Sequence, residues 1–410
     1  MKRKLISLLA AAVVLAMTLA GCGAPVSAPA AAEPAAAVEE AAEAAEEETA
    51  EAVEEVVEEA AEETAGAGLN IAIVSSPSGV DDGSFNQNNY EGILAFIENH
   101  PDSKVTPLRE ETGDVSACIQ LVQDVVADYD VIVCDGFQFA GIGVVAEENP
   151  DVKFILVDAY PTNAEGAEQV YDNVYAMQFK EQESGFAAGV AAALETKTNK
   201  VAVVNGIAYP SNVNYQYGFM AGVNYANKYY GTEAEIVELP SYAGTDVTGA
   251  NVGGNYIGDF ADEATGKVVG KALIDEGCDV ILVAAGGSGN GVFTAAKEAG
   301  GVYVIGCDVD QFDDGVNGDT NIILTSVLKV MDMNDEIQLN KIADGTFAGE
   351  NALLGADTDS TGFVSAEGRC QLSADSIEKI SEAFAKVKSG EIVPPSNFGG
   401  TTPDDFVGLN

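Results

Sequence analysis

The chain has 410 residues, which is enough for two domains of ordinary size. Its 66 acidic and 19 basic residues give a formal net charge of −47, which argues against a nucleic-acid partner because such binding needs clustered lysine and arginine. The single histidine, His100, argues against histidine-based catalytic triads and multi-histidine metal sites. We therefore expect no metal and no cofactor.

None of the six cysteines belongs to a Cys-x-x-Cys pair, which argues against zinc ribbons and thioredoxin-like redox motifs. Cys134, Cys278 and Cys307 lie in or beside apolar runs and are expected in the core. The sequence leaves the disulfide state of Cys118 and Cys370 open.

Residues 1–22 have the pattern of a bacterial lipoprotein signal peptide. Three basic residues at 2–4 precede a mostly apolar run, and Leu-Ala-Gly-Cys at 19–22 has the form of a lipobox. The run is short for a membrane span, so cleavage before Cys22 is favoured over a single-pass anchor or a plain secretory signal. Lipid (palmitate) on Cys22 would hold the protein on the extracytoplasmic face of the cytoplasmic membrane.

Residues 23–68 form a low-complexity linker rich in alanine and glutamate, with no basic residue. Like charges repel, so the linker is expected to be solvated and extended, although alanine and glutamate also permit a single helix. In either form it would act as a spacer between the membrane and the folded part.

A polar loop follows the first expected strand and leads into the first expected helix. Residues 69–74 read as a buried parallel strand, and apolar residues at helical spacing begin at Tyr90. In open α/β sheets, ligands bind at the carboxyl ends of strands. Ser84 or Asn86 would cap the helix, and Phe85, unusual among polar neighbours, would stack on a flat ligand. The candidate binding residues of the loop are Asp82, Ser84, Phe85 and Asn86.

Strands and helices alternate from residue 69 onward, which predicts parallel sheets covered on both faces. The expected strands are 69–74, 105–108, 131–136, 154–158 and 174–177 in a first set, and 201–206, 234–239, 280–285, 302–306 and 322–330 in a second. Two such halves in an exported chain predict a periplasmic-binding-protein type I fold, with two doubly wound α/β lobes joined by a hinge. We expect an N-terminal lobe of 69–177 with 310–352, and a C-terminal lobe of 178–309 with 353–400. The expected crossings are 175–179, 307–324 and 354–362.

Further candidates stand at strand ends. Asp158 and Asp308 each follow an apolar strand, where a carboxylate can accept hydrogen bonds from the N–H or hydroxyl groups of a ligand. Lys329 is a cation among apolar residues, so it should have a buried partner, expected to be Asp308 or Asp310. Gly286 and Gly287 would let the backbone approach a ligand closely.

Residues 82–86, Asp-Gly-Ser-Phe-Asn, followed by Tyr-Glu-Gly at 90–92, resemble the first loop of the basic membrane protein family, the purine nucleoside receptor-like lipoproteins that serve ABC transporters. The resemblance extends from about residue 69 to the C-terminus and is strongest at 180–185, 284–289, 291–293 and 306–311. It implies that Phe85 and Phe260 sandwich a base, although the region around Phe260 departs from the family, so Tyr242 or Tyr256 is an alternative.

The resemblance implies a non-catalytic lipoprotein that captures nucleosides, mainly purine nucleosides, and delivers them to a membrane permease. We expect a monomer. The family's basic residue before Gly-Phe in the second lobe is missing here, where the chain reads Asn-Tyr-Gln-Tyr at 214–217. Two other readings are open: a sugar or autoinducer receptor of the same fold, and a nucleoside hydrolase that uses clustered aspartates, with Asp81 and Asp82 around a cation.

Overall fold

The computed structural model describes residues 68–406. The predicted signal peptide with Cys22, and the linker up to residue 67, lie outside the described residues. Of the cysteines within this range, Cys118, Cys134, Cys278 and Cys307 are buried, Cys370 is half-buried, and all five are free thiols. The expectation that Cys134, Cys278 and Cys307 are core residues is therefore confirmed.

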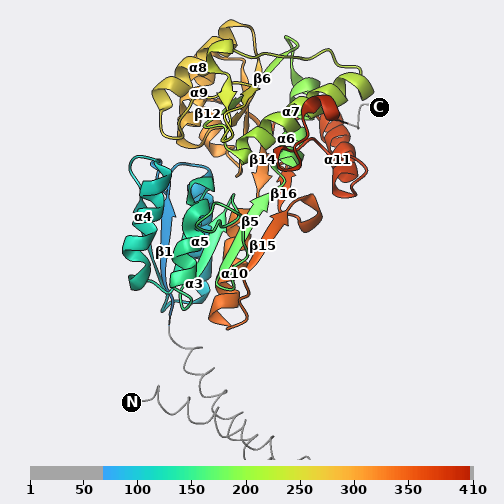
Figure 1. The fold of residues 1–410 in the computed structure, drawn as a ribbon. Coiled ribbons are helices and arrows are strands. Elements are labelled where there is room, and N and C mark those ends of the chain that lie inside the picture. The colour runs from blue at the N-terminus through green and yellow to red at the C-terminus, as the bar shows by residue number, and fades with distance from the viewer. Residues whose placement is uncertain (1–67, 407–410) are drawn as a thin grey trace, which may run out of the picture. The chain divides into compact units, whose positions relative to one another are not determined.

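Two six-stranded sheets form the centres of two lobes (Figure 1). The first has the strand order β15-β5-β4-β3-β1-β2, with every pair parallel. Its strands are β1 (Asn70–Ser75), β2 (Lys104–Arg109), β3 (Val131–Asp135), β4 (Lys153–Val157), β5 (Val174–Phe179) and β15 (Glu350–Leu354).

The second sheet has the order β16-β14-β11-β10-β6-β7, with only the β14–β16 pair antiparallel. Its strands are β6 (Lys200–Asn205), β7 (Glu235–Ile236), β10 (Val280–Ala284), β11 (Tyr303–Gly306), β14 (Ile323–Lys329) and β16 (Thr361–Phe363). Two short antiparallel pairs stand apart: β8 (Gly244–Thr245) with β9 (Asn251–Gly253), and β12 (Val316–Asn317) with β13 (Thr320–Asn321).

Helices cover both faces of each sheet, because the central strands are rich in valine and isoleucine and are buried on both sides. In the first lobe, α3 (Phe85–Asn99) and α10 (Met331–Ala343) cover one face, and α4 (Val115–Val125) and α5 (Gly143–Glu148) cover the other. In the second lobe, α6 (Glu181–Glu195), α7 (Pro210–Tyr229) and α11 (Ala374–Lys388) lie opposite α8 (Glu263–Asp275) and α9 (Gly289–Ala299). The predicted two-lobed α/β architecture is confirmed.

The chain crosses between the lobes three times: from β5 into α6, from β14 into α10, and from β15 into β16. The predicted crossing at 307–324 is wrong, because β14 pairs with β11 and β16 and the crossing follows Lys329. Residues 323–329 therefore belong to the second sheet, whereas the sequence pattern predicts 310–352 in the N-terminal lobe. An apolar strand buried on both faces fits either sheet equally well by its pattern.

Candidate ligand site

Asp82 fixes the loop between β1 and α3 through hydrogen bonds to its side chain. Its buried carboxylate accepts hydrogen bonds from the backbone N–H groups of Ser84 (3.0 Å), Gln87 (3.1 Å) and Asn86 (3.2 Å), and from the Asn86 side chain (3.0 Å). Asp82 thus satisfies the free amides at the start of α3, whereas Ser84, the residue before the helix, makes no side-chain cap. The expectation that Ser84 or Asn86 caps this helix is wrong. Burial raises the pKa of Asp82 to about 6.

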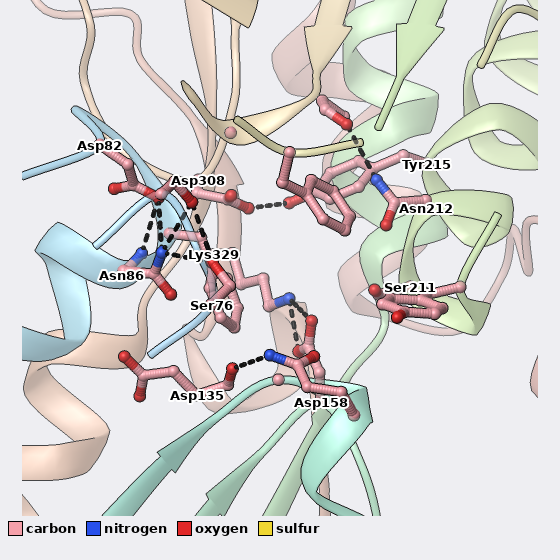
Figure 2. Close-up of a pocket in the computed structure, with 18 residues that line it drawn as sticks. Ser76, Asp82, Asn86, Asp135, Asp158, Ser211, Asn212, Tyr215, Asp308 and Lys329 are labelled. Atoms are coloured by element: carbon pink, nitrogen blue, oxygen red, sulfur yellow. Dashed lines mark hydrogen bonds and ion pairs between the residues drawn. The ribbon is translucent and has the colours of Figure 1, made fainter. Parts of the chain in front are cut away.

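A cavity of about 550 Å³, part of it open to solvent, lies between this loop and the second lobe (Figure 2). From the first lobe it is lined by Ser76, Ser78, Asp82, Phe85, Asn86, Asp135, Gly136, Gln138 and Asp158. From the second it is lined by Tyr209, Ser211, Asn212, Tyr215, Phe260, Ala284, Gly286, Asp308 and Lys329. Most of these residues stand at or just beyond the carboxyl ends of strands of both sheets, as expected for open α/β folds.

Lys329, at the end of β14, is the cation of this cavity and is only 2% exposed. Its Nζ lies 2.5 Å from Asp158 Oδ1 and 3.3 Å from Glu181 Oε1. Nζ is also 4.9 Å from the centroid of the Phe85 ring, close enough for a cation–π contact. Burial would lower the pKa of Lys329, but the neighbouring carboxylates of Asp158 and Glu181 outweigh burial and raise it. Burial raises the pKa of Glu181 to about 7.

The expected pairing of Lys329 with Asp308 or Asp310 is therefore wrong. Asp310 forms an ion pair with Arg369 (Oδ2 to Nε, 2.7 Å). Asp308 accepts a hydrogen bond from the Tyr215 hydroxyl at 2.8 Å and a longer one from Ser84 at 3.3 Å.

Asp158 and Asp308 share an unusual backbone conformation. Their φ angles are 64° and 68°, in the left-handed region that aspartate and asparagine enter more readily than most residues. Asp158 directly follows the parallel strand β4, and Asp308 is the second residue after the parallel strand β11. The sharp turn brings each carboxylate to the cavity wall instead of continuing the strand.

Phe260 is the aromatic residue of the segment 256–262 in the second lobe that lines the cavity. The alternatives do not line the cavity: Tyr256 is buried and donates to Gln216, and Tyr242 packs on the second-lobe core. Gly286 lines the cavity, and a methyl group there would lie 3.6 Å from the Phe260 side chain. Gly287 stands behind Phe260, whose carbonyl oxygen would be 3.1 Å from such a methyl.

Eight of the ten predicted binding residues line the cavity. The other two, Ser84 and Gly287, lie behind the lining residues and do not reach the cavity surface. Sequence reasoning missed the second-lobe residues at 209–215. The polar start of that helix was a usable signal, because it directly follows a buried strand, as the Phe85 loop does. It also missed Asp135, although a carboxylate closing a buried strand matches the pattern that identified Asp158.

Asp135 is fully buried, and its carboxylate points away from Asp158 in Figure 2. Among residues 68–406, no group donates a hydrogen bond to either carboxylate oxygen of Asp135, or of the equally buried Asp335 on α10. Burial raises the pKa of both acids well above the usual range, and Asp335 raises that of Asp135 further.

Because the pKa of Asp335 is higher in the folded state than in the unfolded chain, its contribution to stability falls as pH rises between those two values. Asparagine keeps a buried polar group but cannot ionise, so we expect Asp335→Asn to stabilise the protein at pH 8 by about 1–3 kcal/mol and by less at pH 5. Urea unfolding of both forms at the two pH values measures this. Equal changes at pH 5 and pH 8 would contradict a titrating Asp335.

The chain matches the family model described as "ABC transporter substrate-binding protein PnrA-like", named Bmp, over residues 70–239 and 248–397. The chain belongs to the Bmp family. The unmatched residues 240–247 lie in the region where the sequence departs from the family pattern around Phe260. As a Bmp family member, the chain is a substrate-binding protein of an ABC transporter and not an enzyme.

Relatives of this Bmp protein include a CD4+ T-cell-stimulating antigen of Listeria monocytogenes, 31% identical over 80% of this chain and 88% of that protein. A second is the ABC transporter nucleoside-binding protein BmpA of Lactococcus lactis, 29% identical over 80% of this chain and 89% of that protein. Among solved structures, an ABC transporter solute-binding protein of Aeropyrum pernix has a TM-score of 0.65, with 23% identity over 80% of this chain and 94% of that chain. That likeness supports the fold.

Membership of the Bmp family implies a small-molecule ligand and a transporter partner, at the extracytoplasmic side of the membrane. Within residues 68–406, no helix combines the length and the apolar character that a membrane span needs.

Proposed function

We propose that this protein captures nucleosides, purine nucleosides above all, between its two lobes and delivers them to the permease of an ABC transporter. The observation that carries the proposal is the pairing of rings and carboxylates around one cavity: Phe85 from the first lobe, Phe260 from the second, and Asp158 and Asp308 beside them. Aromatic rings suit the faces of a base, and carboxylates suit ribose hydroxyls and base N–H groups.

The charges of the cavity support an unphosphorylated ligand. Its lining includes four aspartates and one lysine, and that lysine is already paired with Asp158 and Glu181. A phosphate group would lie among carboxylates without a free cation, which costs several kcal/mol in a partly buried site. We therefore expect inosine to bind and inosine 5′-monophosphate to bind far more weakly.

Calorimetry with inosine, guanosine, adenosine, cytidine and ribose, and with inosine 5′-monophosphate, tests the proposal. Mass spectrometry of small molecules released from freshly purified, denatured protein gives an independent answer. Binding of ribose alone, or of no nucleoside at millimolar concentration, would contradict the proposal.

Phe85→Ala is expected to weaken nucleoside binding by about 1–3 kcal/mol, the cost of losing one aromatic stack on a base. Phe347→Ala is a matched control, because Phe347 is also half-buried and packs on the same first-lobe core. Calorimetry with inosine measures both. Unchanged affinity in Phe85→Ala would remove this ring from the site.

We further propose that the mature protein is a monomer held on the membrane by lipid on Cys22, with residues 23–68 as spacer. The Leu-Ala-Gly-Cys sequence at 19–22 supports lipidation of Cys22. Intact-mass analysis of protein extracted from membranes, compared with a Cys22→Ser form, tests it: an unmodified wild-type N-terminus would contradict lipidation.

A further inference from the structure

Three aromatic rings form a continuous row from the first lobe into the second. Phe137 follows β3 of the first lobe, Tyr209 precedes α7 of the second, and Phe260 lies in the segment before α8. The ring centroids of Phe137 and Tyr209 are 5.1 Å apart, and those of Tyr209 and Phe260 are 5.9 Å apart. Both distances are within the range of favourable aromatic pairs. Tyr209 and Phe260 line the cavity, whereas Phe137 does not.

The contact between Phe137 and Tyr209 joins the lobes at a distance from the hinge. The three crossings use β5, β14, β15 and β16, which lie at one edge of each sheet. In the second sheet, β6, after which Tyr209 comes, is three strands away from β14, or about 14 Å at the usual spacing between strands. Rotation about the hinge would therefore move Tyr209 relative to Phe137 and separate the two rings when the lobes open.

We propose that Phe137 and Tyr209 form an aromatic latch that holds the lobes closed and so sets how long a ligand stays bound. Tyr209 also contacts Phe260. A ligand that packs against Phe260 would therefore help to hold Tyr209 in the position where it meets Phe137. Phe137 acts as a positioning residue through Tyr209. The proposal requires capture between two lobes but does not require that the ligand be a nucleoside.

The latch predicts where an effect on binding kinetics should appear. Because a ligand enters the open form and the two rings meet only on closure, loss of the contact should raise the dissociation rate more than it changes the association rate. The loss of one aromatic pair should raise the dissociation rate, and the ratio of open to closed molecules, by about 3- to 10-fold.

Phe137→Ala is the decisive variant, because Phe137 belongs to the latch but does not line the cavity. Val170→Cys and Val268→Cys would place spin labels at exposed positions on the first and second lobes. Electron–electron double resonance between the two labels would then measure the separation of the lobes. The labels go into the full chain carrying Cys22→Ser and Cys370→Ser. We expect Phe137→Ala to increase the open population with and without inosine, Tyr209→Phe to preserve the closed one, and Phe347→Ala to change nothing.

A double-mutant cycle with Tyr209→Ala separates the latch from direct ligand contact. If the two rings act together, the double variant should release radiolabelled inosine no faster than Tyr209→Ala alone. Additive effects, or an unchanged open population in Phe137→Ala, would overturn the latch. If inosine binds no form of the protein, the nucleoside proposal fails, while the ligand-free lobe distances still decide the latch.

Discussion

Lys329→Met is expected to abolish ligand capture and to lower the free energy of unfolding by about 3–5 kcal/mol, the usual effect of removing one partner of a buried ion pair. The substitution keeps an unbranched side chain in place but leaves Asp158 and Glu181 buried without their cation. The carboxyl groups can then escape the cost only by binding protons. The loss of stability should therefore be larger at pH 8 than at pH 5, because protons are scarcer at the higher pH.

Urea unfolding at both pH values, together with calorimetry using inosine, measures these effects. Lys267→Met is the matched control, since Lys267 pairs with Glu298 on the surface, where such pairs contribute about 0–1 kcal/mol. A loss below 1 kcal/mol in Lys329→Met, or the same loss at pH 5 and pH 8, would show that the buried carboxylates do not depend on Lys329.

Gly189→Ala is the second substitution from which we expect a large loss of stability, about 3 kcal/mol, at the upper end of overpacking effects. A methyl group at Gly189 on α6 would lie 2.1 Å from the carbonyl oxygen of Phe219 on α7. Gly222 on α7 is in the same position, 2.1 Å from the carbonyl oxygen of Phe186 on α6. Backbone cannot rotate away as a side chain can, so the two helices would have to separate.

Because α6 begins at Glu181 and α7 carries Tyr215 and Asn212, separating these helices would also move site residues. We expect Gly189→Ala to weaken inosine binding as well as to lower the urea midpoint. Gly362→Ala serves as the control, since the nearest atom to its added methyl is 4.0 Å away. A wild-type urea midpoint in Gly189→Ala would contradict the close backbone contact.

The loop that holds Phe85 could be predicted because its evidence is local: an apolar strand, a polar stretch with an aromatic residue, then helical spacing. Asp158 and Asp308 could be predicted for the same reason, since each closes a strand. The partners of Lys329 could not, because Asp158 and Glu181 are 171 and 148 residues away in sequence and meet it only through the chain crossings. Capping of α3 by Asp82 was missed because a capping residue normally stands directly before its helix, whereas two residues separate Asp82 from α3.

The lobe to which β14 belongs also could not be predicted. The strand is apolar and buried on both faces, and this pattern identifies a central strand without identifying its neighbours. Tyr209 was missed because a tyrosine before a helix has many ordinary roles. Its place in the cavity wall and its contact with Phe137 depend on how the two lobes come together, which the sequence does not show.

The left-handed backbone at Asp158 and Asp308 limits which variants of this receptor can arise by single changes. Asparagine and glycine tolerate that conformation, whereas β-branched residues there are strained. If Asp158 and Asp308 contact the ligand as proposed, a change of ligand would thus proceed through an asparagine amide or a bare glycine backbone at these two positions, which would replace a carboxylate acceptor without disturbing the turns. A library restricted to these three residue types at both positions would explore most of the recognition chemistry that the turns permit.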